Sequence, residues 1–281
     1  MSRLITFLSD YGLGDPFVGL CHAAILRACP DARIIDLSHA VAPHDVVHGA
    51  ARLADAVPYV GGPAVHLAVV DPGVGSGRRA LVLEAGEQLF VGPDNGLLTE
   101  AVEAVGGLTA AWALDDEQFL ESVTARTFHG RDLFAPVTGR LGAGTPVSHM
   151  ASRLDPDELV RLGEPQVSTS LGYVDVPVRD IDRFGNLQLA CPPDVLEDVG
   201  IATGRATVVH ARGVEWAARR VQTFGDLAPG EIGLLEDSFG WVAVVVGNGD
   251  AGLRLGIGLH EPVTLESHVE VDLDGRDALD A

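Results

Sequence analysis

The sequence predicts an α/β N-terminal domain with a largely parallel sheet, followed by a smaller β-rich, barrel-like C-terminal domain. A chain of 281 residues with 47% hydrophobic content is long enough for two ordinary domains. The first half alternates apolar runs, Gly/Asp/Pro loops and helical patterns, which is typical of βα units. Beyond about residue 170 the apolar runs are short and separated by Gly, Asp and Pro, which favours β structure.

Apolar periodicity assigns the elements of the first domain. Pro16 is placed to begin the first helix, and Pro30 prevents its continuation. The abrupt break after the third apolar strand comes from Asp71-Pro72-Gly73. The predicted strands cover residues 4–8, 33–37 and 64–70, and the predicted helices cover 16–28, 45–57 and 131–141.

The domain limits follow from a change of pattern. We expect the α/β domain over residues 1–160 and the β-rich domain over 171–268, because the segment 150–170 is irregular and contains proline. Residues 269–281 are acidic and low in aromatics, which predicts a flexible tail. The predicted strands of the second domain are 172–178, 206–211, 231–235 and 241–246.

Charge limits the partners of this protein. With 40 acidic and 19 basic residues, the formal net charge is -21, so we expect neither nucleic acid nor an anionic membrane as a partner. A small or cationic ligand suits such a surface better. All 19 basic residues are arginine, which excludes a Walker-type phosphate loop and Schiff-base catalysis, since both need a lysine.

The cysteines and the N-terminus indicate a cytoplasmic protein. Cys21, Cys29 and Cys191 form no CxxC pair, so we expect buried free thiols in a reducing compartment. The apolar stretch before Asp10 is too short for a signal peptide, and no segment reaches membrane-spanning length.

Polar residues follow two of the predicted strands. Asp10 comes after the first strand and Asp71 after the third. In open α/β sheets ligands bind outside the carboxyl ends of the strands, so both carboxylates lie where a site is expected. His129 directly precedes a predicted helix, another position that favours polar ligands.

Five short motifs at compatible spacings carry a family resemblance that is much more specific than any single glycine-rich loop. They extend from the first strand to the second domain. The motifs are Ser9-Asp10-Tyr11-Gly12, Val70-Asp71-Pro72-Gly73-Val74-Gly75 with Arg78 and Arg79, Pro93-Asp94-Asn95-Gly96, Thr127-Phe128-His129-Gly130-Arg131-Asp132, and Phe184-Gly185-Asn186. Together they resemble the S-adenosyl-L-methionine hydroxide adenosyltransferase family.

The resemblance implies an enzyme that uses water to split S-adenosylmethionine into adenosine and methionine. It implies Asp71, Arg78 and His129 as catalytic residues and requires no metal or organic cofactor. These residue types suit the chemistry, because water has a pKa of about 15.7 and needs a base and a cation to become a nucleophile near neutral pH. Which of the three removes the proton is left open by the sequence.

The resemblance also implies the substrate contacts and the assembly. It places the ribose hydroxyls on Asp10, whose carboxylate can accept two hydrogen bonds from a diol. From the second domain it brings Asp182, Phe184, Asn186 and Ser238 to the substrate. It further implies a homotrimer with sites between subunits. After Ser238 the chain departs from the family pattern, because residues 241–246 lack the usual Glu and Asn248 is shifted by one.

Three alternatives stay open. Halide-using relatives share the fold and substrate, but a halide carries no proton, so Asp71, Arg78 and His129 together favour water. A non-catalytic sensor of adenosyl ligands would keep the pocket without the reaction. His44 and His48 stand four residues apart, which on a helix would place two metal ligands on one face.

Overall fold

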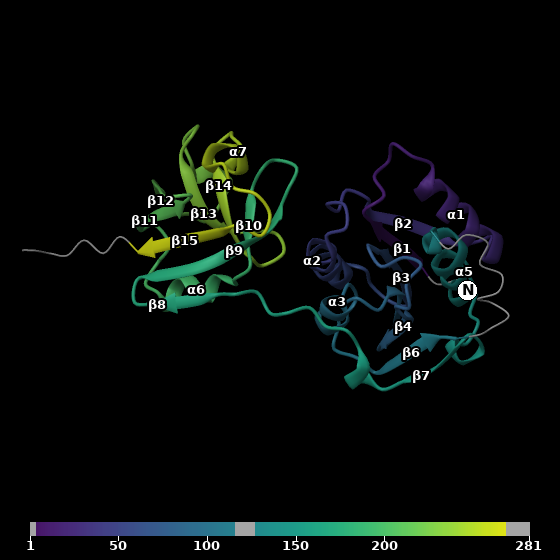
Figure 1. Ribbon diagram of the computed structural model, residues 1–281. Helices are drawn as coiled ribbons and strands as arrows, with labels where there is room; N and C mark the ends of the chain where they lie inside the picture. Colours follow the sequence, from purple (N-terminus) through teal and green to yellow (C-terminus); the bar gives the residue numbers. More distant parts are fainter. Residues whose placement is uncertain (1–3, 116–126, 268–281) are drawn as a thin grey trace, which may run out of the picture. The chain divides into compact units, whose positions relative to one another are not determined.

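The computed structural model describes residues 4–115 and 127–267 (Figure 1). The chain divides after Gly163 into two compact units, and each is considered by itself. The acidic tail predicted over residues 269–281 lies outside the described residues. Within the described ranges, no helix combines the length and the apolar character needed to cross a bilayer.

The first unit contains a seven-stranded sheet in the order β2-β1-β3-β5-β4-β6-β7. The strands β2, β1, β3 and β5 are parallel, as the βα pattern predicts, and β4, β6 and β7 extend the sheet in antiparallel pairing. The strands are β1 (Leu4–Ser9), β2 (Arg33–Ser38), β3 (Ala64–Val69), β4 (Ala80–Ala85), β5 (Gln88–Pro93), β6 (Ala110–Leu114) and β7 (Ala151–Leu154).

Helices cover both faces of this sheet (Figure 1). On one face, α1 (Phe17–Ala28) and α5 (Ala135–Gly142) pack over a buried cluster that includes Phe7, Leu67 and Val91. On the other, α2 (Val46–Ala56) and α3 (Thr99–Ala104) pack over a second buried cluster. Successive side chains of a strand point to opposite faces, so Phe7 and Leu8 belong to different clusters.

The second unit is a closed barrel of seven strands, which confirms the barrel-like prediction. The order β10-β14-β13-β12-β11-β15-β9 is closed by pairing of β9 with β10, and β8 extends β9. The strands are β8 (Ser168–Ser170), β9 (Tyr173–Ile181), β10 (Leu187–Leu189), β11 (Ala206–Ala211), β12 (Val214–Arg220), β13 (Ile232–Glu236), β14 (Val242–Val246) and β15 (Pro262–Ser267). Two short helices accompany them, α6 (Pro193–Asp198) and α7 (Ala251–Leu255).

The segment predicted to be irregular, 150–170, contains one strand of the first sheet. Residues Ala151–Leu154 form β7, which pairs with β6 at the sheet edge. A strand of four residues is too short to give a periodic signal, and its position depends on the pairing with β6. The irregular prediction was therefore wrong at this strand.

A histidine lies in the centre of the parallel sheet. His66 in β3 is fully buried, with Nδ1 2.7 Å from Thr6 Oγ1 and Nε2 2.8 Å from Gln88 Oε1. The amide oxygen can only accept, so Nε2 carries the proton and the Thr6 hydroxyl donates to Nδ1. Burial lowers the pKa of His66 to about 4 and keeps the ring neutral at neutral pH.

We predict that His66 makes the stability of the protein sensitive to acid. The ordinary pKa is 6.5 and the folded-state pKa is about 4, so between these values the unfolded chain binds the proton first. The free energy of unfolding should therefore fall by about 2 kcal/mol between neutral pH and about pH 5 because of this residue. Urea unfolding at both pH values measures the effect. His66→Gln should lose this pH-dependent part of the free energy of unfolding, whereas His149→Gln, a control at an exposed position, should retain it. An equal fall in the free energy of unfolding for wild type and His66→Gln would contradict the prediction.

Candidate active site

The first unit contains a cavity of about 530 Å³ at the carboxyl ends of β1 and β3. Asp10 follows β1 directly, and Asp71 comes two residues after the end of β3. Both carboxylates line this one cavity, as the strand-end rule predicts. The cavity is lined by Asp10, Tyr11, Phe17, Pro43, His44, Val69, Asp71, Val74, Thr127, Phe128, His129, Gly130 and Arg131.

The three residues implied as catalytic form one connected chain. Arg78 Nε donates to Asp71 Oδ1 at 3.0 Å and to Oδ2 at 3.1 Å, and its Nη2 also contacts Oδ2. The same Nη2 donates to Nδ1 of His129 at 2.9 Å. The side chains of Arg78 and Asp71 are only 11% and 6% exposed, so solvent screens their attraction weakly. Arg78 thus fixes the carboxylate and the imidazole relative to each other.

This chain of hydrogen bonds determines the tautomer of His129. A guanidinium can only donate, so Nδ1 of His129 must be the acceptor and the neutral ring carries its proton on Nε2. Burial and the Arg78 cation lower the pKa of His129, while Asp71 and Asp132 oppose the shift. His129 is therefore neutral at neutral pH, and its Nε2 N–H is its one hydrogen-bond donor.

His129 precedes a turn of π-helix, η2 (Gly130–Phe134), that leads into α5. Single π-helical turns are frequent at functional sites. The turn also positions its own charged residues, because Arg131 Nη2 donates to Asp132 Oδ2 at 2.7 Å. The Arg131 guanidinium lies 5.0 Å from the centre of the Phe128 ring. The predicted helix start near residue 131 is confirmed, with a π-helical first turn in place of an α-helical one.

The motif Pro93-Asp94-Asn95-Gly96 forms hydrogen bonds with residues adjacent to Asp71 and Arg78. Asn95 Nδ2 donates to the carbonyl oxygen of Val70 at 2.9 Å, directly before Asp71. Asp94 is buried and accepts from Arg79 Nε at 2.7 Å. Arg79 thus binds Asp94, whereas the neighbouring Arg78 binds Asp71 and His129. The sequence could not assign different partners to two adjacent arginines.

Tyr11 is a site residue that sequence reasoning missed. It lies in the cavity lining next to Asp10, and its ring packs edge-on against Phe17 and Phe128 at 5.9 and 5.7 Å. A Cβ atom on Gly130 would lie 2.1 Å from the Tyr11 hydroxyl oxygen, so glycine is required there. Its position directly after Asp10 was the available signal, but an aromatic residue in a loop more often indicates packing.

Asp10 keeps room for a ligand. Its Oδ2 accepts from the backbone N–H of His44 at 2.9 Å, and this is one of about four acceptor sites on an ionised carboxylate. His44 has φ of 67°, a left-handed conformation outside α2. The side chain of Asp10 can therefore still accept hydrogen bonds from a diol in the cavity.

The expectation that His44 and His48 lie on one helix face is wrong. His48 lies in α2 and is buried, and its Nδ1 accepts from the backbone N–H of Ala42 at 3.1 Å. His44 precedes the helix, because Asp45 is the N-cap and accepts from the backbone N–H of His48 at 2.9 Å. The spacing of four residues therefore does not place the two rings on one helix face.

The second unit brings the other predicted residues together around a cavity of about 310 Å³. Asp182 Oδ1 accepts from the backbone N–H groups of Phe184 and Asn186 at 2.8 and 2.9 Å, and Asn186 Nδ2 donates to Asp182 Oδ2 at 2.7 Å. This tight turn holds the Phe184 side chain 75% exposed. An exposed aromatic ring at a cavity offers a stacking face.

Ser238 lies in the turn between β13 and β14 at the same cavity. Asp237 accepts from the backbone N–H groups of Phe239 and Trp241 at 2.8 and 3.0 Å and from Gln188 Nε2 at 2.7 Å. The lining therefore contains four carboxylates together with aromatic rings, which favours a cationic ligand. The lining residues are Asp180, Asp182, Phe184, Asn186, Gln188, Phe224, Glu236, Asp237, Ser238, Phe239 and Ala243.

The departure from the family pattern lies inside the barrel. Residues Val242–Val246 form β14, all five are buried, and of these Ala243 lines the cavity. Asn248 is exposed in the turn after β14 with φ of 52°. Asn248 is not among the residues that line the cavity.

Fold and site together define an α/β domain with a charged strand-end site and a β-barrel domain with an acidic, aromatic cavity. The family model of the SAM hydroxide adenosyltransferase N-terminal domain matches residues 5–151, and that of the C-terminal domain matches residues 176–264. The chain therefore belongs to the SAM hydroxide adenosyltransferase family.

Individual relatives agree with this assignment. An (R)-S-adenosyl-L-methionine hydrolase of Salinispora tropica is 47% identical over 90% of this chain and 94% of its own length. A fluorinase of Actinoplanes sp. is 28% identical over 70% of this chain and 74% of its own length. The crystal structure of an uncharacterised conserved protein from Thermotoga maritima superimposes with a TM-score of 0.87 at 32% identity, covering 93% of this chain and 99% of that one.

We predict that Gly130→Ala destabilises the protein and that Tyr11→Phe reverses the effect. The added methyl group would lie 2.1 Å from the Tyr11 hydroxyl oxygen but 3.0 Å from the ring carbon that bears it. Overpacking of this kind costs about 1–3 kcal/mol, and deleting the oxygen removes the closest contact. Thermal unfolding of the single and double variants measures the compensation. Gly19→Ala, where the new Cβ meets no atom within 4 Å, is the control. Additive effects of the two substitutions would contradict the prediction.

Proposed function

We propose that the protein hydrolyses S-adenosyl-L-methionine to adenosine and L-methionine by attack of water or hydroxide at the ribose C5′. The observation that carries the proposal is the hydrogen-bonded chain of Asp71, Arg78 and His129 at a cavity of about 530 Å³. Membership of the family and the names of the hydrolase relatives support the same reaction.

The chain of three residues suits activation of water. Arg78 supplies a permanent positive charge that stabilises a developing hydroxide. The neutral His129 offers the Nε2 proton as a donor that holds the water oxygen, since Arg78 occupies its Nδ1. Each oxygen of Asp71 keeps further acceptor capacity beyond its bonds to Arg78, so Asp71 can accept a hydrogen bond from the water.

The reaction cancels charge in its transition state, because an anionic nucleophile displaces a neutral thioether from a sulfonium. An enclosed site favours such a step, since water stabilises the separated ions more than the partly neutralised transition state. We propose that the reaction uses neither a metal ion nor an organic cofactor. We propose that Asp10 binds the ribose diol. The amino-acid and nucleoside parts of the substrate are proposed to contact Asp182, Phe184, Asn186 and Ser238.

The competing functions make different predictions for the same substrate. A halide-using adenosyltransferase would need fluoride or chloride and gains nothing from a proton acceptor. A sensor would bind S-adenosylmethionine and release it unchanged. The pairing of Arg78 with both Asp71 and His129 favours water over either alternative.

We predict that the protein, incubated with S-adenosylmethionine in halide-free buffer made with oxygen-18 water, produces adenosine labelled at its 5′ oxygen. Mass spectrometry of the product measures the label. His129→Ala should lower kcat by about 10²–10³-fold, the usual cost of losing a hydrogen-bond donor that stabilises developing charge. His149→Gln, an exposed histidine outside the cavity, is the matched control.

Three outcomes separate the functions. Labelled adenosine from the wild type and the control, but not from His129→Ala, supports hydrolysis. A requirement for halide, or unlabelled adenosine, would contradict water attack. Tight binding with recovery of unchanged substrate would support the sensor instead.

We also propose a homotrimer in which the first domain of one subunit and the second domain of its neighbour enclose the substrate. The support is that each unit by itself carries part of the predicted contacts, with the catalytic residues in one and Asp182 with its neighbours in the other. Cyclic assembly is a common way to enclose a ligand between subunits.

We predict that two inactive variants restore activity when coexpressed. His129→Ala removes the catalytic group of the first domain, and Asp182→Ala removes the turn that supports the second-domain contacts. In mixed trimers with shared sites, some sites combine two intact domains, so activity should return to about a tenth or more of wild type. Light scattering gives the oligomeric state. Coexpressed variants that assemble into mixed oligomers but stay inactive would contradict sites shared between subunits.

A further inference from the structure

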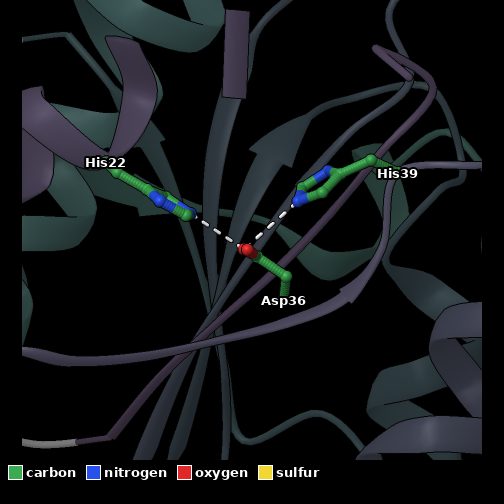
Figure 2. Close-up of side chains that lie close together, drawn as sticks. All are labelled: His22, Asp36 and His39. Carbon is green, nitrogen blue, oxygen red and sulfur yellow. Dashed lines mark hydrogen bonds and ion pairs between the residues drawn. The ribbon is translucent and has the colours of Figure 1, made fainter. Parts of the chain in front are cut away.

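A second group of polar side chains lies outside the cavity, between α1 and the end of β2. His22 comes from α1, Asp36 from β2 and His39 from the residue after β2. Nε2 of His22 lies 2.8 Å from Asp36 Oδ1, and Nε2 of His39 lies 3.1 Å from the same oxygen. Figure 2 shows both rings directed at this one carboxylate oxygen. One atom from each of the three residues lies within 4.8 Å of the others.

One ring nitrogen of His39, the buried member of this group, has no hydrogen-bond partner among the described residues. The His39 side chain is only 3% exposed, and its contact with Asp36 does not have the geometry of a hydrogen bond, so Nε2 has no hydrogen-bond partner among the described residues. A buried nitrogen without a partner lowers the stability of the folded state. An additional group that Nε2 can bind would remove this cost.

The hydrogen bond of the other nitrogen of His39, Nδ1, can leave Nε2 with a lone pair. Nδ1 lies 2.8 Å from Ser9 Oγ, whose hydroxyl also accepts from the backbone N–H of Tyr11 at 3.3 Å. When Nδ1 carries the proton and donates to Ser9, Nε2 presents a lone pair to the Asp36 carboxylate. Two electron-rich atoms then face each other across 3.1 Å, an arrangement that a cation between them stabilises. Metal-bound histidines usually donate their other N–H to such an acceptor.

The surroundings hold both rings in place and leave one side open. The Phe7 ring contacts His39 at 4.6 Å and His22 at 6.0 Å, both edge-on. The side chains of His22 and Asp36 are 28% and 40% exposed, so water can reach the group and complete a coordination shell. The net charge of -21 also raises the local concentration of cations.

We propose that His22, Asp36 and His39 bind a divalent transition-metal ion of the zinc type. Two imidazole nitrogens and one carboxylate oxygen are a common donor set for Zn²⁺ and for Co²⁺ or Ni²⁺. Three protein ligands leave a position for water. The site is distinct from the cavity that contains Asp71, Arg78 and His129, and it is proposed as a site that joins α1 to the end of β2.

Such an ion would also stabilise the loop that carries Asp10. The carbonyl oxygen of His39 accepts from the backbone N–H of Gly12 at 2.8 Å, and its Nδ1 contacts Ser9. His39 thus holds both ends of the segment 9–12 that includes Asp10. Fixing His39 through a metal would limit the motion of this segment.

The test uses untagged full-length protein freed of metal by a chelator. Isothermal titration with Zn²⁺ should give one site per chain, and Co²⁺ should give the visible absorption of a low-coordinate complex with nitrogen and oxygen ligands. Zn²⁺ should also raise the thermal unfolding midpoint, because it binds the folded state. The half-exposed position of His22 makes His22→Gln a variant that should fold.

Variants separate a metal site from a set of hydrogen bonds. His22→Gln should weaken Zn²⁺ binding by about 100-fold or more, and Ser9→Ala by about 10–100-fold, the usual effect of losing a group that orients a ligand. His210→Gln is the matched control, because His210 also pairs with a carboxylate, Glu266, at 2.6 Å. Wild-type protein without a Zn²⁺ site, or equal binding by wild type and His22→Gln, would overturn the proposal and leave a hydrogen-bonded contact between helix and sheet.

Discussion

The candidate active site depends on one guanidinium group. Arg78 is bound to Asp71 through both carboxylate oxygens and to His129 through Nη2, so its plane sets the relative positions of a residue after β3 and a residue before η2. A lysine could not replace it, because an ammonium lacks the planar fork that binds a carboxylate bidentately. Burial and, after it, the charge of Arg78 lower the pKa of His129, which keeps the imidazole neutral and its Nδ1 available as the acceptor. Arg78 therefore contributes to both the geometry and the protonation of this site.

The rest of the first unit fixes the two segments that Arg78 joins. The sheet orders β1 and β3 side by side in parallel, which brings Asp10 and Asp71 to the same edge. Asn95 binds the carbonyl of Val70, and Asp94 binds Arg79, so the loop that begins at Asp71 is held from two sides. On the other side, Gly130 allows Tyr11 to lie against the backbone of η2. Close packing at these contacts leaves Arg78 few alternatives to its observed position.

The sequence predicted the fold class and the strand-end positions, because these follow from apolar periodicity and from general properties of parallel sheets. Asp10 and Asp71 were placed correctly on that basis, and Pro16 and Pro30 marked the ends of α1. The antiparallel extension by β4, β6 and β7 was not predictable, because short apolar runs do not specify which strands pair. The same limit applies to side chains. Nothing in the sequence distinguishes the partners of Arg78 from those of Arg79, and the spacing of His44 and His48 suggested a pair that the left-handed backbone at His44 prevents.

Residues 9–12 lie between the cavity that Asp10 lines and the cluster of His22, Asp36 and His39. Asp10 faces the cavity, whereas the neighbouring Ser9 is fully buried and binds His39 on the other side. Asp10 Oδ2 also accepts from the backbone N–H of His44, so this contact orients the carboxylate while His39 holds the residues on either side of Asp10. The role proposed for Asp10, binding of the ribose diol, would gain from such preorganisation, because less rotational freedom is lost when the ligand binds. The contacts of His39 with Ser9 and Gly12 therefore help to orient the segment that carries Asp10, and they act through the backbone of residues 9–12.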